Sequence, residues 1–329
     1  MIFLTGGSGL LGLHILEDQR DRGGAVMALA RSPAAASAVA ARGATPVTGD
    51  VTDPATWDRV EGVRAIVHAA ALIAGKGGWP AYERANVHAT RLAARRARAL
   101  GVPLVHLSSV AVYQHGLLGA APGSVTEDHP TGSRTRGQHY ARSKRLAEDV
   151  VREEMGRGLR AVLLRPCVVY GTGDRLFLPN VVRRARHGLF PVVGGGTRPL
   201  AMVHARNVAV AVAAALNQPA ALGRTYNVTN DGEVTGRDLV AALATGLGRP
   251  VRAACLPFPP LLGAAAVVDL LLRLTGRSSF GLREAVRFLR GGNPYTSHRL
   301  ATELGWRPVV AHPSALPEAI RAAAATPAP

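Results

Sequence analysis

Cysteine, aromatic residues and lysine are all scarce in this chain of 329 residues. The two cysteines, Cys167 and Cys255, lie far apart in the sequence, which excludes a disulfide framework and favours a reducing compartment. Cys167 stands in the apolar run AVLLRPCVVYG, so we interpret it as a packed thiol rather than a nucleophile. The N-terminus, MIFLTGG, lacks a basic segment, and its apolar stretch is too short for a signal peptide. A cytoplasmic location is therefore expected.

Acidic residues are also few: 22 of them stand against 39 basic residues, which gives a formal net charge of +17. All but two of the basic residues are arginines, and they are scattered along the chain. Aromatic residues make up only 5%, and no zinc-ligand spacing accompanies the arginines, so no nucleic-acid-binding module is indicated. We interpret the charge as a solvated basic face without a specific nucleic-acid partner. It would also suit an anionic ligand such as a phosphorylated cofactor, and no metal site is expected.

Long hydrophobic runs are absent except at residues 256–274 (LPFPPLLGAAAVVDLLLRL). Three prolines at its start and Asp269 within it leave a helical part too short to cross a bilayer. We expect a buried or lid helix here, with peripheral membrane contact through 256–274 as the open alternative. The last residues, 322–329, contain only Ala, Thr and Pro and predict a flexible tail.

Short apolar runs alternate with helical patterns over the first 170 residues, which is typical of a parallel sheet with crossover helices. Helices are expected at 10–22, 79–100, 140–155, 176–187, 205–216, 235–247, 261–274 and 282–289. The strand runs are apolar throughout, as strands covered on both faces should be. The sequence therefore predicts an α/β fold with a Rossmann-type doubly wound parallel sheet (1–170). A strand near 225–228 would return to it, and a smaller, partly interleaved substrate-binding cap would occupy 171–321.

A glycine-rich turn, TGGSGLLG at residues 5–12, follows the first expected strand and opens the first helix. Glycines let a backbone approach a pyrophosphate closely, and the helix N-terminus supplies unpaired N–H groups with a partial positive charge. Because the turn stands in this strand–helix context, it predicts a dinucleotide site. The residues expected to bind the cofactor here are Gly6, Gly9, Leu10, Leu11 and Gly12.

The end of the second strand indicates which dinucleotide binds. NAD-binding folds place an acid against the ribose 2′-hydroxyl, but this chain has Ala30 at that point, followed by Arg31 and Ser32. An acid would repel a 2′-phosphate, whereas arginine offers it a planar fork of donors. We therefore predict NADP(H) as the preferred cofactor, with NAD(H) as the alternative.

Asp50 follows the third strand, with Val51 next to it. Its carboxylate could accept a hydrogen bond from the adenine amino group, or it could serve only as a turn residue. We favour the cofactor contact and expect Val51 to share it.

Tyr140 and Lys144 open a helix, and their i,i+4 spacing puts phenol and ammonium on one face. The chain has only two lysines, Lys76 and Lys144, against 37 arginines, so a lysine four residues after a tyrosine indicates selection for chemistry. An adjacent ammonium favours the phenolate, and we expect it to pull the pKa of Tyr140 down toward the working pH.

Ser108 and Ser109 end the strand VPLVHL, where ligands gather in open α/β sheets. A serine hydroxyl there can hydrogen-bond a substrate oxygen and stabilise charge that develops on it. Serine as an acyl nucleophile is the rival interpretation, but no G-x-S-x-G motif is present.

Together these residues resemble the extended short-chain dehydrogenase/reductase family, also called the NAD-dependent epimerase/dehydratase superfamily. The likeness covers nearly the whole chain through TGGSGLLG, GDVTD, HAAA, NVHAT, LSSVAVY, YARSK, LRPCVVYGTGD and ELGW. In that family the serine four residues before the strand-end tyrosine is catalytic, which here selects Ser109, because Tyr113 follows it by four. The resemblance implies that Tyr140 exchanges a proton with the substrate oxygen during hydride transfer, while Lys144 stabilises the phenolate and holds the nicotinamide ribose. Further cofactor contacts are expected at Ala69, Ala70 and Pro166.

Two branches of the family compete. Sugar-nucleotide epimerases and dehydratases carry an Arg-Asp-aromatic run before a segment like VHARNVA, and there this chain has Leu200 and Ala201, with Arg198 close by as a substitute. The apolar 256–274 segment and Asn207-Val208-Ala209 are more similar to the 3β-hydroxysteroid dehydrogenase branch. We therefore expect reduction or oxidation of an apolar ketone or alcohol, with a nucleotide-sugar enzyme as the alternative and a non-catalytic dinucleotide sensor as the third.

The substrate pocket is the least defined part of the prediction. The candidate lining residues are Lys76, Trp79, Tyr82, Val110 and Cys167. Lys76, Trp79 and Tyr82 follow the HAAA strand end, and an ordinary loop and helix start is an equal interpretation for them. A homodimer is left open as the oligomeric state.

Overall fold

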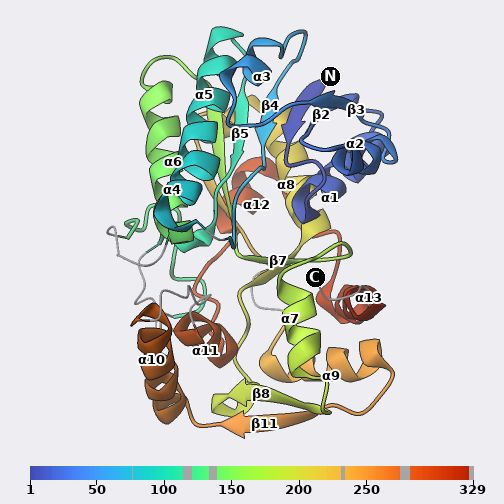
Figure 1. Ribbon diagram of the computed structural model, residues 1–329, viewed down its shortest axis with the longest axis vertical. Helices are drawn as coiled ribbons and strands as arrows, with labels where there is room; N and C mark the ends of the chain where they lie inside the picture. Colours follow the sequence, from blue (N-terminus) through green and yellow to red (C-terminus); the bar gives the residue numbers. More distant parts are fainter. Residues whose placement is uncertain (76, 114–120, 133–138, 231–233, 275–281, 326–329) are drawn as a thin grey trace.

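The computed structural model describes residues 1–75, 77–113, 121–132, 139–230, 234–274 and 282–325, and its centre is a seven-stranded sheet (Figure 1). The strands run in the order β10-β6-β5-β4-β1-β2-β3, and all neighbours pair in parallel. Their bounds are β1 Ile2–Thr5, β2 Val26–Ala30, β3 Thr45–Thr48, β4 Ile66–His68, β5 Leu104–Leu107, β6 Ala161–Pro166 and β10 Thr225–Val228. The Rossmann-type fold class is confirmed, and β10 is the returning strand.

Helices cover both faces of the sheet, because alternate residues of each buried strand point to opposite faces. Ile2 and Leu4 of β1 join the cluster that holds α1 and α8, whereas Phe3 between them joins the cluster under α5 and α6. The helices of this part of the molecule are α1 Leu10–Asp21, α2 Pro33–Ala40, α3 Pro54–Asp58, α4 Gly78–Tyr82, α5 Ala89–Ala99, α6 His139–Met155, α8 Ala205–Asn217 and α12 His298–Leu304. Helices α8 and α12 therefore belong with the sheet although they follow residue 171.

The long helix expected at 79–100 is interrupted in its middle. A π-helical segment, Glu83–His88, joins α4 to α5. Such segments occur frequently at functional sites because they re-aim the side chains that follow. Its consequence for Asn86 is described with the site.

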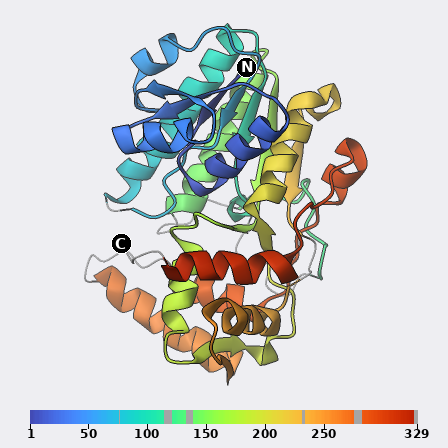
Figure 2. The ribbon, with the colours of Figure 1, turned by 90° about the vertical axis from the view of Figure 1, so that its right-hand side faces the viewer.

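The cap lies below the carboxyl ends of the strands and has a core of its own (Figures 1 and 2). It contains two small parallel sheets, β7–β9 and β8–β11. Its elements are β7 Val168–Tyr170, α7 Phe177–Arg184, β8 Leu189–Val193, β9 Met202–His204, α9 Gly236–Leu247, β11 Arg252–Leu256, α10 Phe258–Leu274, α11 Leu282–Arg290 and α13 His312–Ala325. Across the described residues, no helix combines the length and apolar character needed to span a membrane.

The predicted tail at 322–329 is wrong for its first half. Residues 322–325 belong to α13, which lies across the cap (Figure 2), and the side chain of Ala323 is buried in the cap core. Helix α9 approaches α13 so closely that a Cβ on Gly246 would lie 2.7 Å from the carbonyl oxygen of Pro317. Gly246 allows this close helix packing because it has no side chain, and residues 326–329 lie outside the described residues.

Candidate active site

The glycine-rich turn follows the carboxyl end of β1 and packs tightly against the residues after β4 and against the first turn of α1. Gly6 has φ +74°, and a Cβ there would lie 2.7 Å from the backbone nitrogen of Ala70. A Cβ on Gly12 would lie 2.1 Å from the carbonyl oxygen of Gly6, so the first turn of α1 rests directly on the loop. Only glycine fits these two positions. Residues Gly6 to Gly12 and the N-terminus of α1 thus form a concave surface of backbone atoms, which we call the glycine cradle. It fits the pyrophosphate of a dinucleotide.

The turn lies where the strand order reverses. Strand β1 has β4 on one side and β2 on the other, and the chain builds outward from it in both directions. Ala69 and Ala70 follow β4, and the hydroxyl of Thr5 accepts a hydrogen bond from the backbone nitrogen of Ala70 at 3.2 Å. Gly9 caps α1 through extended backbone with no side chain over the helix end, which leaves the N–H groups around Leu10 and Leu11 open to a ligand.

Arg31 is exposed at the end of β2, and Ser32 beside it caps α2 by accepting from the backbone of Ala35 at 3.2 Å. Oδ1 of Asp50 accepts from both the nitrogen and the hydroxyl of Thr52, each at 2.8 Å. Burial alone would raise the pKa of Asp50, but these hydrogen bonds and the nearby charge of Arg31 hold it below its ordinary value. Asp50 thus has the turn role that the sequence left open, and its contact with adenine stays a prediction.

Ser109 and Tyr140 meet at the carboxyl end of the sheet. The hydroxyl of Ser109 hydrogen-bonds the phenol of Tyr140 and also accepts from the backbone nitrogen of Ala111 at 3.2 Å, at the start of the short turn Val110–Val112. Burial raises the pKa of Tyr140 to about 12, and the hydrogen bond with Ser109 opposes this rise. The expectation of a depressed phenol pKa is therefore wrong for this structure: burial outweighs the attraction of any nearby cation.

Lys144 is buried one turn further along α6. Its ammonium donates to the carbonyl oxygen of Leu107 at 2.6 Å. Burial lowers the pKa of Lys144 to about 8, and the negative charge of Glu148 opposes the shift. The ammonium is thus held at the carboxyl end of β5, the strand that leads to Ser109.

Two imidazoles under the ammonium stay neutral. His68 and His106 stack with ring centroids 5.5 Å apart, and both are buried. Burial, with the charge of Lys144 added, lowers the pKa of His68 to about 3 and that of His106 well below its ordinary value. Glu148 is consequently the nearby charge that supports the Lys144 ammonium.

Glu148 and Arg165 form a buried ion pair that the sequence did not single out. The guanidinium of Arg165 donates to both carboxylate oxygens of Glu148, at 2.8 and 2.6 Å, and both side chains are buried. Ser108 donates to the same carboxylate at 2.6 Å, so its hydroxyl is committed there. Burial alone would raise the pKa of Glu148, but the hydrogen bonds and charge of Arg165 keep it below its ordinary value. The arrangement leaves Ser109 as the serine that faces Tyr140.

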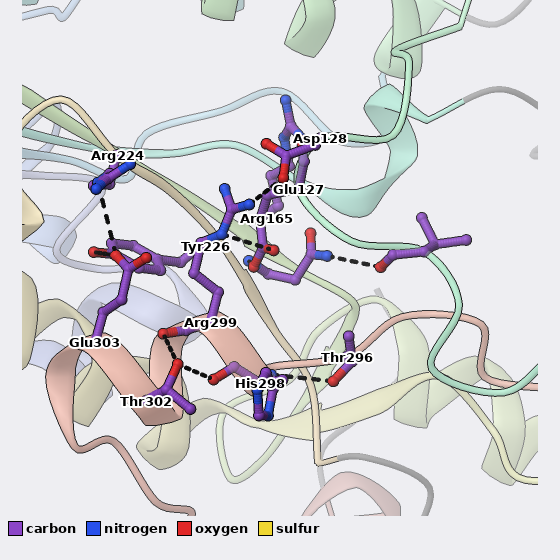
Figure 3. A network of polar contacts seen from close by, with 12 residues as sticks. Glu127, Asp128, Arg165, Arg224, Tyr226, Thr296, His298, Arg299, Thr302 and Glu303 are labelled. Atoms are coloured by element: carbon purple, nitrogen blue, oxygen red, sulfur yellow. Dashed lines mark hydrogen bonds and ion pairs between the residues drawn. The ribbon is translucent and has the colours of Figure 1, made fainter.

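The same guanidinium extends the network to the outer edge of the sheet (Figure 3). Arg165 donates to the hydroxyl of Tyr113 at 2.8 Å and to the carbonyl oxygen of Glu127 at 3.3 Å. Glu127 accepts from the backbone nitrogen of Asn227 at 2.7 Å and pairs with Arg299 of α12 at 3.5 Å. Sequence spacing could not predict these partners, since they come from four separate segments.

Asn86 is a further buried residue that sequence reasoning did not assign, although its motif NVHAT was noted. It lies in the π-helical segment, and its amide accepts from the nitrogen and donates to the oxygen of Leu72, at 2.7 and 2.9 Å. Its Nδ2 also donates to the hydroxyl of Ser143 at 2.8 Å, and that hydroxyl donates to the carbonyl of Tyr140. Asn86 thereby fixes the loop after β4 to the first turn of α6.

The predicted pocket residues on α4 pack against α6. The guanidinium of Arg142 lies 3.7 Å from the ring centre of Trp79, and the phenol of Tyr82 donates to the carbonyl of Ile73 at 3.2 Å. Tyr82 is also close enough to Tyr140 to raise its pKa slightly. Lys76 lies outside the described residues.

The remaining predicted positions follow β5, β6 and the third strand. Cys167 is buried in the main core with its nitrogen bonded to the oxygen of Val228 at 3.1 Å, as expected of a packed thiol. Pro166 ends β6, Val110 packs against the same core, and the carbonyl of Val51 accepts from the indole of Trp57 at 2.9 Å. Their contacts with cofactor or substrate stay predictions.

Known proteins are similar to this chain in sequence and in fold. The model of the NAD dependent epimerase/dehydratase family matches residues 2–229. A 4-hydroxy-2-methyl-3-oxo-4-farnesyl-3,4-dihydroquinoline-1-oxide ketoreductase of Stigmatella aurantiaca is 31% identical over 327 residues, 98% of this chain and 96% of that protein. A 2-alkyl-3-oxoalkanoate reductase of Stenotrophomonas maltophilia is 29% identical over 84% of this chain and 85% of its own. The structure of MoeE5 in complex with UDP-glucuronic acid and NAD has a TM-score of 0.72 at 22% identity, covering 98% of each chain.

The chain belongs to the NAD-dependent epimerase/dehydratase family. It is accordingly an NAD(P)-dependent oxidoreductase of the extended short-chain dehydrogenase/reductase type, with ketoreductases among its relatives.

Proposed function

We propose that this protein is an NADP(H)-dependent ketoreductase that acts on an apolar carbonyl compound, with Ser109, Tyr140 and Lys144 as its catalytic residues. The observation that carries the proposal is the hydrogen bond between Ser109 and Tyr140, one helical turn from the buried ammonium of Lys144. All three lie at the carboxyl end of the sheet, at the same edge as the glycine cradle.

The raised pKa of Tyr140 suits the reductive direction. A reduced nicotinamide cofactor held at Gly6, Gly9 and Gly12 would supply a hydride to the carbonyl carbon, and the resulting alkoxide would need a proton. With a pKa of about 12 the phenol is protonated at neutral pH, and an alkoxide is a stronger base than a phenolate, so the proton passes from Tyr140 to the substrate oxygen. Ser109 donates a hydrogen bond to that oxygen as charge develops on it. Lys144 supplies the positive charge that stabilises the phenolate left behind.

The preference for NADP(H) rests on Arg31. NAD-binding folds carry an acid at the end of the second strand. Here β2 ends at Ala30 instead, and the exposed Arg31 follows it. A planar fork of donors suits a 2′-phosphate, and Gly6, Gly9 and Gly12 would hold the pyrophosphate.

The apolar substrate is supported by the relatives and by the cap. The names of the two relatives describe a farnesylated quinoline oxide and a 2-alkyl-3-oxoalkanoate, both ketones with aliphatic parts. In the cap, Leu200 is buried in the core and Ala201 is partly buried. An aliphatic side chain cannot pair with a diphosphate, which favours a ketone over a nucleotide sugar.

Substitution of Tyr140 tests the proposal. Tyr140→Phe should lower kcat for ketone reduction by about 10²–10⁴-fold, because the proton donor is lost, while NADPH affinity measured by fluorescence stays within twofold. Tyr226→Phe is the matched control and should keep near-normal turnover, since its hydroxyl donates to Glu303 of α12 at 2.8 Å. The substrate panel should contain alkyl β-keto acids, cyclic ketones and UDP-sugars, each with NADPH and NADH. Full activity of Tyr140→Phe, or turnover confined to UDP-sugars, would refute the proposal.

A further inference from the structure

Helix α10 of the cap is oriented with its apolar side outward. The side chains of Val267, Leu270 and Leu271 are exposed by 57%, 57% and 56%. Asp269 points the other way: it is buried and accepts from the backbone nitrogen of Leu282 at 3.0 Å. A helix on a protein surface normally shows the opposite pattern, with its apolar stripe toward the core.

The exposed face is continuous along the helix. At about 100° per residue, the exposed positions between residues 260 and 271 span an arc of roughly 160° without a charged side chain. They are Pro260, Gly263, Ala264, Val267, Val268, Leu270 and Leu271. The helix forms the outer edge of the cap beside α11, and no described element lies outside it (Figure 1). A contiguous apolar patch of this kind marks a surface that something else covers.

Positive charge lies near the start of this apolar face. Arg252 is exposed at the start of β11, the strand that leads into α10. Arg290 at the end of α11 holds its guanidinium 4.1 Å from the ring centre of Phe258, at the first turn of α10. The apolar stripe therefore has a cation beside its first turn, on a chain with a formal net charge of +17.

A second copy of this chain is a poor partner for such a surface. The exposed stretch of twelve residues is about 18 Å long and roughly 10 Å wide, so it offers far less than the ~800 Å² per partner that a stable protein interface buries. Two copies would also bring like charges together, since each chain carries +17.

From these observations we propose that α10 docks the protein on the surface of an anionic phospholipid bilayer. Its apolar face enters the boundary between headgroups and acyl chains, and the neighbouring arginines bind the phosphate groups. The helix lies in the plane of the interface rather than across it. An apolar ketone of the kind proposed above partitions into lipid, so docking would bring the enzyme to its substrate. The docking itself does not depend on the catalytic proposal.

Vesicle flotation with the full chain tests the docking. We expect the protein to float with vesicles of phosphatidylcholine and phosphatidylglycerol at low salt, and to bind weakly to phosphatidylcholine alone or at high salt. Val267→Asp combined with Leu271→Asp should lower the partition coefficient at least about tenfold, because each leucine-sized side chain contributes that much when it is buried. The matched control is Val309→Asp, whose side chain is 62% exposed in the segment between α12 and α13; it should bind like the parent.

Three results would overturn the proposal. The full chain could stay unbound with anionic vesicles, or the double variant could bind as well as the parent. Alternatively, sedimentation without lipid could show a dimer that the double variant converts to a monomer, which would assign the face to a second copy. Circular dichroism and turnover of a short-chain, water-soluble ketone verify that the variants fold. Flotation needs no substrate, so a failure of docking leaves the catalytic proposal standing, and the reverse also holds.

Discussion

Glu148→Gln should destabilise the protein strongly, although glutamine has nearly the same shape. The carboxylate is buried and accepts from Ser108 and twice from Arg165, at 2.6 to 2.8 Å. The substitution leaves the buried guanidinium of Arg165 without its counter-ion, which costs about 3–5 kcal/mol. Unfolding entropy of about 2.1 cal/mol/K per residue gives about 0.7 kcal/mol/K for 329 residues, so Tm should fall by about 4–7 °C.

Calorimetry on the variant and on a surface control measures this effect. The control is Glu153→Gln on the same helix, which breaks the ion pair with Arg157, where the two side chains are 53% and 50% exposed. An exposed pair of this kind contributes less than about 1 kcal/mol, so Tm should fall by less than about 1.5 °C. Equal shifts for Glu148→Gln and Glu153→Gln would refute the reasoning that the buried pair dominates.

The same variant should move the pH profile. Glu148 raises the pKa of Lys144, which burial has lowered to about 8, so removing its charge lowers that pKa further. The ammonium is the active form in the proposed mechanism, and activity should fall as pH rises through its pKa. We therefore expect the alkaline limb of kcat/KM to lie near pH 8 for the parent and at lower pH for Glu148→Gln. A limb that moves upward, or not at all, would contradict the proposed link between the two residues.

Two further predictions concern the cofactor. Gly12→Ala places a Cβ 2.1 Å from the carbonyl of Gly6 and should weaken NADPH binding at least about tenfold in fluorescence titration, with a stability loss of about 1–3 kcal/mol. Gly263→Ala, in open space on α10, is its control, and equal NADPH affinity for both variants would show that the cradle does not bind the cofactor. Arg31→Ser should raise KM for NADPH by about 10–100-fold, the worth of a hydrogen bond to a charged group, and leave KM for NADH within twofold. Equal changes for both cofactors would remove the argument for NADP(H).

Local patterns were sufficient for the strands of the sheet and for helices α1, α6 and α8, whereas α2, α3 and α12 were not predicted. β1, β2, β4 and β5 are short apolar runs, and both faces of each are covered, so no competing interpretation exists for them. Helix α13 was not predicted, because Pro317 disfavours helical structure locally. In the folded protein, packing of α13 against α9 compensates for this cost. The π-helical segment before α5 was not predicted either, and the partners of its Asn86, Leu72 and Ser143, lie 14 and 57 residues away in the sequence.

The amino-acid sequence determined the fold class, the glycine cradle and the pairing of Tyr140 with Lys144 on one helix face, because each depends on short-range spacing. The tertiary structure alone decided the electrostatics of the site. Burial makes Tyr140 a protonated phenol and lowers the pKa of Lys144, and Arg165 from β6 holds the Glu148 carboxylate that opposes this lowering. The outward apolar face of α10 was likewise settled by tertiary packing, since a hydrophobic run does not reveal which of its sides the rest of the protein covers.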